Sequence, residues 1–155
     1  GNNLRNGSII IDDRTKMVNE ISYKKYFIEF NTNTVFMSIN GTIGSLAFYN
    51  GEEIILGKSA AYFIISDESL NKVFLYNLLH SDYARKYYSQ SATGLTIKNL
   101  GLKALRNFSI PLPPLSLQQA FAARIIAIES QKDKVKQQIT DLQTLFDSRM
   151  QYYFD

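Results

Sequence analysis

The sequence contains no cysteine, only one histidine and only three prolines. Without cysteine, disulfide frameworks, thiolate zinc sites, iron–sulfur clusters and thiol nucleophiles are excluded, and such a composition is typical of proteins from a reducing compartment. No apolar run reaches the roughly 18 to 20 residues that span a bilayer, and the N-terminus shows no signal-peptide pattern. We therefore expect a soluble, cytoplasmic chain with no membrane contact.

Recognisable catalytic motifs are missing as well. The single histidine, His80, has no second histidine or cysteine with which to form a metal site or a triad. No phosphate-binding glycine loop and no nucleophile elbow occurs. The adjacent carboxylates, such as Glu52-Glu53, should point apart rather than work as an acid/base pair. We expect no catalytic residue, no metal site and no cofactor.

The composition does allow a packed domain. Of 155 residues, 45% are hydrophobic and 13% are aromatic, which suffices for one core. The net charge of +3 is unevenly spread, because all of the basic excess lies between residues 61 and 116. The cations of this stretch could form a phosphate-facing surface or simply a solvated face; they are Lys72, Arg85, Lys86, Lys98, Lys103 and Arg106.

Residues 23–65 are predicted to be rich in β-structure. The runs "KKYFIEF", "TVFMSIN", "SLAFYN", "EIILG" and "AAYFIIS" are short and heavy in β-branched and aromatic residues. Asn40-Gly41 and Asn50-Gly51 have the composition of type I′ turns and predict an antiparallel meander. Gly41 and Gly44, in "GTIG", favour a tight hairpin over a phosphate loop, because no helix follows.

After residue 65 the apolar spacing becomes helical. One helix is predicted over residues 69–90, with Asp67 or Ser69 as its N-cap. A short helical turn at residues 99–105 and an extended strand at residues 108–111 should follow. The fold class predicted is α/β of the α+β kind, with a small, mostly antiparallel, β-rich domain.

The C-terminal segment gives the clearest pattern. Pro111, Pro113 and Pro114 force an extended approach, and Ser116 with Gln119 has the spacing of a capping box. A helix over residues 117–153 would be roughly 55 Å long and would protrude from the domain. Apolar residues recur along it at heptad spacing and predict pairing with another helix; these are Phe121, Ile125, Ile128, Val135, Ile139, Leu142, Phe146 and Tyr153. We expect two domains, residues 1–112 and residues 113–155.

Three segments occur in an order that resembles a known family. They are "NGTIGSLAFYNGEE", "FLYNLLHSDYARKYY" and "ATGLTIKNLGLKALRNFSIPLPPLSLQQAFAARI", the last running into the long helix. Together they resemble one half of the specificity subunit of type I restriction-modification systems. The most specific part is the block from Ile110 to Gln119, and the resemblance covers roughly residues 30–155.

This resemblance implies a target-recognition domain that reads one half of a bipartite double-stranded DNA sequence in the major groove. It also implies that the long helix pairs antiparallel with a counterpart and acts as a spacer. DNA methyltransferase (modification) subunits and a restriction/motor subunit would be the protein partners, and the specificity subunit itself would be non-catalytic.

The chain departs from the family in carrying one recognition domain and one spacer helix instead of two, and the usual opening of the domain is missing. It would be a fragment, or a half-subunit that works as a homodimer or with a second half-subunit. Two other readings stay open: the C-terminal recognition domain of a fused methyltransferase or nuclease, and a coiled-coil scaffold that binds only protein.

Candidates for DNA contact are side chains that can bind phosphates or base edges from loops. In the β-rich region they are Arg14, Lys16, Lys24, Lys25, Asn40, Lys58 and Ser59, and further along the chain they are Lys98, Lys103 and Arg106.

Overall fold

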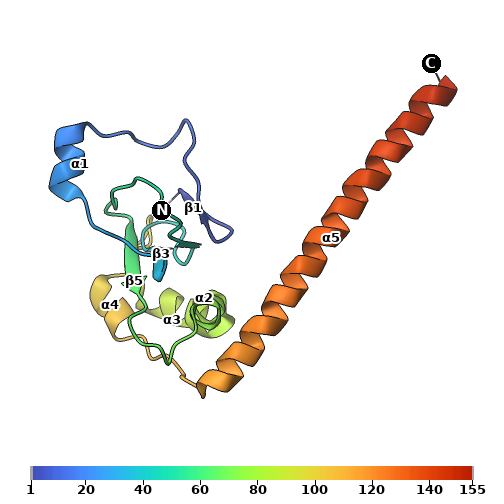
Figure 1. Ribbon diagram of the computed structural model, residues 1–155. Helices are drawn as coiled ribbons and strands as arrows, with labels where there is room; N and C mark the ends of the chain where they lie inside the picture. Colours follow the sequence, from blue (N-terminus) through green and yellow to red (C-terminus); the bar gives the residue numbers. More distant parts are fainter. Residues whose placement is uncertain (1, 155) are drawn as a thin grey trace.

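The computed structural model describes residues 2–154 and shows a globule from which one long helix departs (Figure 1). The predicted class is confirmed: small antiparallel sheets with helices precede a long C-terminal helix. The elements are β1 (Leu4–Arg5), β2 (Ser8–Ile9), α1 (Glu20–Tyr26), β3 (Thr34–Ser38), β4 (Leu46–Phe48), β5 (Ala60–Ile64), α2 (Lys72–His80), α3 (Asp82–Ser91), α4 (Leu102–Arg106) and α5 (Leu115–Phe154).

Strand β3 is the centre of the globule. All five of its residues are buried, and it pairs antiparallel with β4 on one side and β5 on the other. Because side chains alternate along a strand, Val35 and Met37 join a core with Leu75 of α2, whereas Phe36 joins a second core with Phe30. The sheet therefore has a packed layer on each face.

The order of the strands corrects one prediction. The strands are antiparallel as expected, but β3 lies between β4 and β5, so the three do not form a meander. Asn40-Gly41 and Asn50-Gly51 lie in the longer connections 39–45 and 49–59 rather than in two-residue turns. The sequence did not predict these longer connections, because an Asn-Gly pair also occurs where only one residue needs a positive φ. Gly41 is such a residue, with φ +70°.

A two-residue Asn-Gly turn does occur, at Asn6-Gly7. Leu4 pairs with Ile9 across this turn, and Asn6 and Gly7 have φ values of 51° and 81°. Two positive φ values are the signature of the type I′ hairpin. The backbone N–H of Phe48 donates to the Gly7 carbonyl at 2.9 Å, which attaches this hairpin to the edge of β4.

Two predicted strands are absent from the described chain. "KKYFIEF" is divided between helix α1 and irregular backbone, and "EIILG" is irregular. The Asn19 side chain caps α1 by accepting from the Ser22 N–H, and Lys24 pairs with Glu20 at 2.6 Å. These local interactions outweigh the aromatic content, and α1 buries none of its described residues.

The single helix predicted over residues 69–90 is two helices. Ser81 ends α2, and its side chain caps α3, so the chain bends where the apolar spacing continues. The N-cap of α2 is Asn71 rather than Asp67 or Ser69. Similarly, the predicted turn at residues 99–105 is the helix α4, which begins at Leu102.

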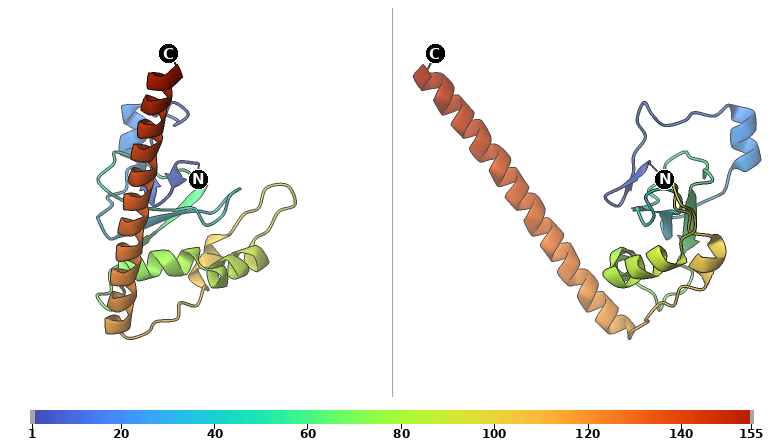
Figure 2. Two further views of the ribbon diagram at one scale, coloured as in Figure 1. Left: turned by 90° about the vertical axis from the view of Figure 1, so that its right-hand side faces the viewer. Right: turned by 180° about the vertical axis from the view of Figure 1, so that it is seen from behind.

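Residues 107–114 connect α4 to α5 without regular structure, so the strand predicted at residues 108–111 is wrong. Helix α5 has 40 residues, which at 1.5 Å per residue makes it about 60 Å long. It extends away from the globule in Figure 1 and in the right-hand view of Figure 2. Across residues 2–154, no helix has the length and apolarity required to cross a membrane.

Candidate nucleic-acid interface

Three segments meet at the carboxyl end of β3. The backbone N–H of Ile39 donates to the Ser59 carbonyl at 2.9 Å, and the Ile39 carbonyl accepts from the Leu100 N–H at 2.8 Å. The Gly41 N–H donates to the Lys98 carbonyl at 2.9 Å. We call residues 39–41, 58–59 and 98–100 the β3-end surface.

This surface assembles four of the predicted DNA-contacting residues from separate parts of the sequence. Lys58 and Lys98 are exposed, and Asn40 and Ser59 are half-buried beside them. The Oδ1 atom of Asn40 is buried, and no residue between 2 and 154 donates a hydrogen bond to it. Phosphate-binding and base-reading side-chain types therefore lie together here.

Helices α3 and α4, which precede and follow residues 98–100 in the sequence, carry exposed cations. Helix α3 supplies Arg85 and Lys86, and helix α4 supplies Lys103 and Arg106. Residues 83–128 contain no aspartate or glutamate at all. Arg85 and Lys86 were predicted as part of a basic stretch that could face phosphates, but not as individual DNA contacts, and this acid-free run is the sequence signal that singles them out. Asp82 is the one acidic residue in these two helices, against four cations, and this basic excess favours phosphate binding.

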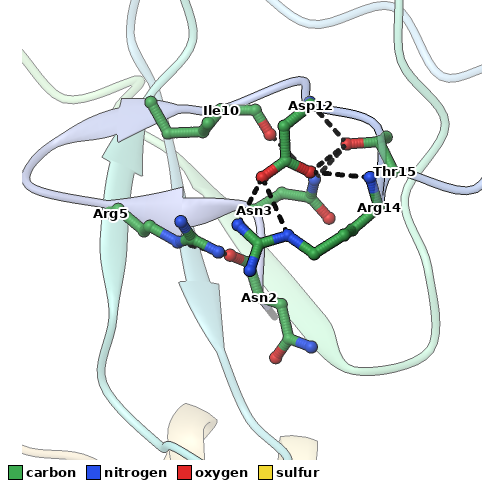
Figure 3. A network of polar contacts seen from close by, with 7 residues as sticks. All are labelled: Asn2, Asn3, Arg5, Ile10, Asp12, Arg14 and Thr15. Atoms are coloured by element: carbon green, nitrogen blue, oxygen red, sulfur yellow. Dashed lines mark hydrogen bonds and ion pairs between the residues drawn. The ribbon is translucent and has the colours of Figure 1, made fainter.

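Arg14 is engaged elsewhere, in a network of its own (Figure 3). Its Nη2 atom lies 2.7 Å from Oδ2 of Asp12, whose Oδ1 accepts from the Arg14 backbone N–H. The hydrogen bond from the Arg14 side chain lowers the pKa of Asp12. Because the guanidinium already has a carboxylate partner, phosphate would have to compete for it.

Of the other predicted contacts in the N-terminal region, Lys24 and Lys25 lie on α1, and Lys16 lies in the irregular backbone before it. This helix stands on the opposite side of the globule from α3 and α4 (Figures 1 and 2). Lys24 pairs with Glu20, and the Nζ atom of Lys25 lies 5.3 Å from the ring centre of Tyr26. The predicted DNA contacts thus divide into two groups, with Lys16, Lys24 and Lys25 outside the β3-end surface.

The predicted pairing residues of α5 also divide into two groups. Phe121 packs edge-on against Phe74 of α2, with ring centres 6.0 Å apart, and Ile125 is half-buried. From Ile128 onward the predicted residues are exposed, as Leu142 with 65% of its surface accessible illustrates. The exposed members are Ile128, Val135, Ile139, Leu142, Phe146 and Tyr153. We call these six the free seam.

The joint between globule and helix depends on Gln118, which is 1% exposed. Its Oε1 atom accepts from the Asn71 N–H at 2.9 Å. Its Nε2 atom donates to the carbonyls of Ser69 and Pro113 at 2.9 and 2.8 Å. One side chain thus ties the first turn of α5 both to the start of α2 and to the proline segment.

The capping box predicted at the joint is incorrect. Helix α5 begins at Leu115, so Ser116 lies inside its first turn, and Gln119 is exposed. The carbonyl of Pro114 accepts the first backbone N–H groups instead, from Leu117 at 2.9 Å and Gln118 at 3.2 Å. The sequence pattern favoured Gln119 because its spacing from Ser116 is that of a capping box. Two of the three partners of Gln118, Asn71 and Ser69, are nearly 50 positions away and leave no local signal.

Titratable groups in the globule do not gather into a reactive site. The ring of His80 lies 4.8 Å from that of Tyr76, and its pKa is lowered by burial and by the charge of Arg85. Burial also raises the pKa of Tyr88. Among residues 2–154, no group of three histidine, cysteine or acidic side chains could hold a metal ion.

Comparison with known proteins gives concordant results. The family model "Type I restriction modification DNA specificity domain" matches residues 2–143. The MjaVIII specificity subunit of Methanocaldococcus jannaschii is 36% identical over 91 residues, covering 57% of this chain and 21% of that protein. The EcoBI specificity subunit of Escherichia coli is 24% identical over 140 residues, covering 89% and 29%.

A solved structure shares the fold. The type I restriction-modification S subunit from M. genitalium superposes with a TM-score of 0.54 at 21% identity, over 70% of this chain and 29% of that one. The chain thus spans less than a third of the length of each of these relatives. Because the family model covers most of the sequence, the chain belongs to the type I restriction-modification DNA specificity domain family, whose part in these systems is to specify the DNA sequence rather than to catalyse.

Proposed function

We propose that this chain is a DNA-specificity module that reads one half of a bipartite double-stranded target. The globule carries the recognition surfaces, and α5 is the spacer that fixes the distance to a second recognition domain. The β3-end surface supports DNA contact, because Lys58, Lys98 and Asn40 lie together at one end of the sheet, in a chain whose residues 83–128 have no acidic side chain.

The observation that carries the spacer role is the free seam. Six apolar side chains follow one heptad line of a helix that has left its own globule. An isolated helix with such a seam is only marginally stable in water, so a second helix should cover it. A rod of about 60 Å corresponds to between one and a half and two turns of duplex, taking about 34–36 Å per turn.

The partners proposed follow from this arrangement. The second helix belongs to another copy of this chain, in a homodimer, or to a second half-subunit. DNA methyltransferase (modification) subunits and a restriction/motor subunit would dock on the resulting assembly, which positions them on the DNA.

Co-purification with the methyltransferase subunit of the same system, followed by mapping of methylated bases, tests the proposal. We expect a stable complex that methylates one two-part sequence with a fixed gap, and a palindromic one if the chain is a homodimer. The methyltransferase alone is the control and should not methylate that sequence. Methylation without any common sequence would contradict the proposal.

Binding to DNA separates this proposal from a scaffold that binds only protein. Affinity of the assembled complex for duplex DNA should fall steeply as salt rises, because phosphate contacts release counterions. A complex that shows no salt-dependent association with any duplex would favour the scaffold.

A further inference from the structure

Residues 92–99 form a projecting hairpin, which we call the 92–99 hairpin. Thr93 and Asn99 exchange two backbone hydrogen bonds, of 2.9 and 2.8 Å. Gly94 closes the loop with φ +98°, and a Cβ atom there would lie 2.2 Å from the Ile97 carbonyl oxygen. Only glycine fits at this position, so the turn is tightly specified.

The base of the hairpin is fixed to the globule. Ala92 donates to the Tyr88 carbonyl at 2.8 Å, and Leu100, which is fully buried, donates to Ile39 at 2.8 Å. The Lys98 carbonyl accepts from Gly41. The loop in yellow stands clear of the helices in the left view of Figure 2. It is therefore a projection held by hydrogen bonds on both sides and not a loose segment.

The tip of the hairpin is apolar. Leu95 is 100% exposed, and Ile97 is 67% exposed. Leu95 and Ile97 thus place two exposed aliphatic side chains on one projection, which favours contact with another molecule.

A basic pocket lies below the tip. It has a volume of about 250 Å³, and Arg85 and Lys98 are the two charged side chains that line it, with Tyr88 and Gly41 in its walls. The acidic group nearest to Arg85 is Asp82 at 4.0 Å, in an exposed pair that contributes little. Lys98 forms no ion pair with any residue from 2 to 154. Two cations that line one pocket favour the binding of an anion there. In a DNA-specificity domain, the anion available for binding is a backbone phosphate.

We propose that the 92–99 hairpin and this pocket form a clamp on double-stranded DNA that acts independently of sequence. A backbone phosphate binds between Arg85 and Lys98, and Leu95 packs against sugar and base edges of the adjacent groove, where apolar side chains are often inserted. Neither cation reads a base edge in this arrangement, so the clamp positions the domain while other residues select the sequence. This inference rests on the proposed function, because it requires that the domain binds DNA.

The test uses the complex with the methyltransferase, with fluorescence anisotropy on a target duplex and on a scrambled duplex across a range of salt. Arg85→Ala with Lys98→Ala should weaken binding to both duplexes equally, by roughly tenfold, and should reduce the salt slope by about one. Leu95→Ser should weaken both by roughly threefold to tenfold without altering the slope, because it removes no charge.

Matched controls separate this clamp from general surface effects. Lys134→Ala removes an exposed cation from α5, and Ile21→Ser removes an aliphatic side chain that is 79% exposed on α1; both should bind as the unchanged protein does. Arg85→Lys with Lys98→Arg should restore the salt slope. All substituted residues are exposed, so thermal unfolding should be unaffected in every variant.

Three outcomes would overturn the clamp while leaving the proposed function intact. The first is normal binding of both duplexes by the alanine pair and by Leu95→Ser. The second is loss of affinity for the target duplex alone, which would make the hairpin a sequence reader. The third is loss of methyltransferase binding with DNA affinity retained, which would make the hairpin a protein-docking element. If the unchanged complex bound no DNA, the proposed function itself would fail, and the clamp with it.

Discussion

The globule and the long helix use their apolar side chains in opposite ways. In the globule, Met37 is fully buried and Leu79 is 2% exposed. In the outer part of α5, Ile139 and Leu142 are 62% and 65% exposed. The same types of side chain thus stabilise the chain's own fold in one region and remain available to another molecule in the other. The boundary lies near Ile128, where α5 leaves α2.

Breaking the free seam should have the largest effect. Ile139→Lys with Leu142→Lys places two charges where helices would pair, and burying unpaired charges is costly. We expect self-association, or pairing with a second half-subunit, to weaken by more than about a hundredfold, which is about 3 kcal/mol. Sedimentation equilibrium measures this. Gln137→Lys, on the far side of the same helix from the seam, should associate normally, and equal behaviour of the two variants would refute the assignment of the seam.

The same Leu→Ala substitution should have different effects in the globule and in the outer part of α5. Leu79→Ala should lower the free energy of unfolding by about 2–5 kcal/mol, because it leaves a cavity in the core. Leu142→Ala should change it by less than about 0.5 kcal/mol in urea titrations at concentrations where the chain is monomeric. A large loss for Leu142→Ala under those conditions would show that α5 folds back on its own globule.

The joint can be tested with neighbouring glutamines. Gln118→Ala leaves the Asn71 N–H and the carbonyls of Ser69 and Pro113 without their partner, and each buried group left unpaired costs about 1–3 kcal/mol. We expect a total loss of about 3 kcal/mol, because water can reach some of these groups. Gln119→Ala, at an exposed position, should be nearly neutral. If Gln119→Ala were the more damaging change, the capping box would be correct after all.

The smallest effect concerns pH and should be confined to the globule. Burial and Arg85 lower the pKa of His80 below its usual 6.5, so below that pH the unfolded chain takes up a proton that the folded chain resists. The free energy of unfolding should therefore be highest above about pH 6.5 and should fall as the pH drops toward 5.5. His80→Gln should flatten this decline in urea midpoints. Asp12 and Asp67 titrate below this window, because their pKa values are lowered from 3.8.

Some elements could be predicted from sequence because local pattern and tertiary packing agree there. "TVFMS" was predicted as a strand and is a strand in the structure, because its β-branched and apolar residues fit a position buried on both faces. Helix α5 was predicted within two residues at its start and one at its end, because heptad spacing over ten turns is unmistakable.

Other elements were missed where one residue overrides the pattern. Asn19 starts a helix inside an aromatic run, and Ser81 both ends and begins a helix within continuous apolar spacing. The grouping of these residues into the β3-end surface could not be predicted from the sequence. Asn40, Lys58 and Lys98 become neighbours only through the strand order and the contact between residues 40 and 99, neither of which leaves a local signal.

Helix α5 is proposed to set the distance between two recognition domains. Inserting seven residues between Ile139 and Thr140 lengthens the helix by about 10 Å while keeping the seam in phase. Mapping of methylated bases with the reconstituted methyltransferase should then show the same two half-sites with a gap about three base pairs longer, taking about 34–36 Å per 10–10.5 base pairs. An unchanged gap, with methylation retained, would contradict the account.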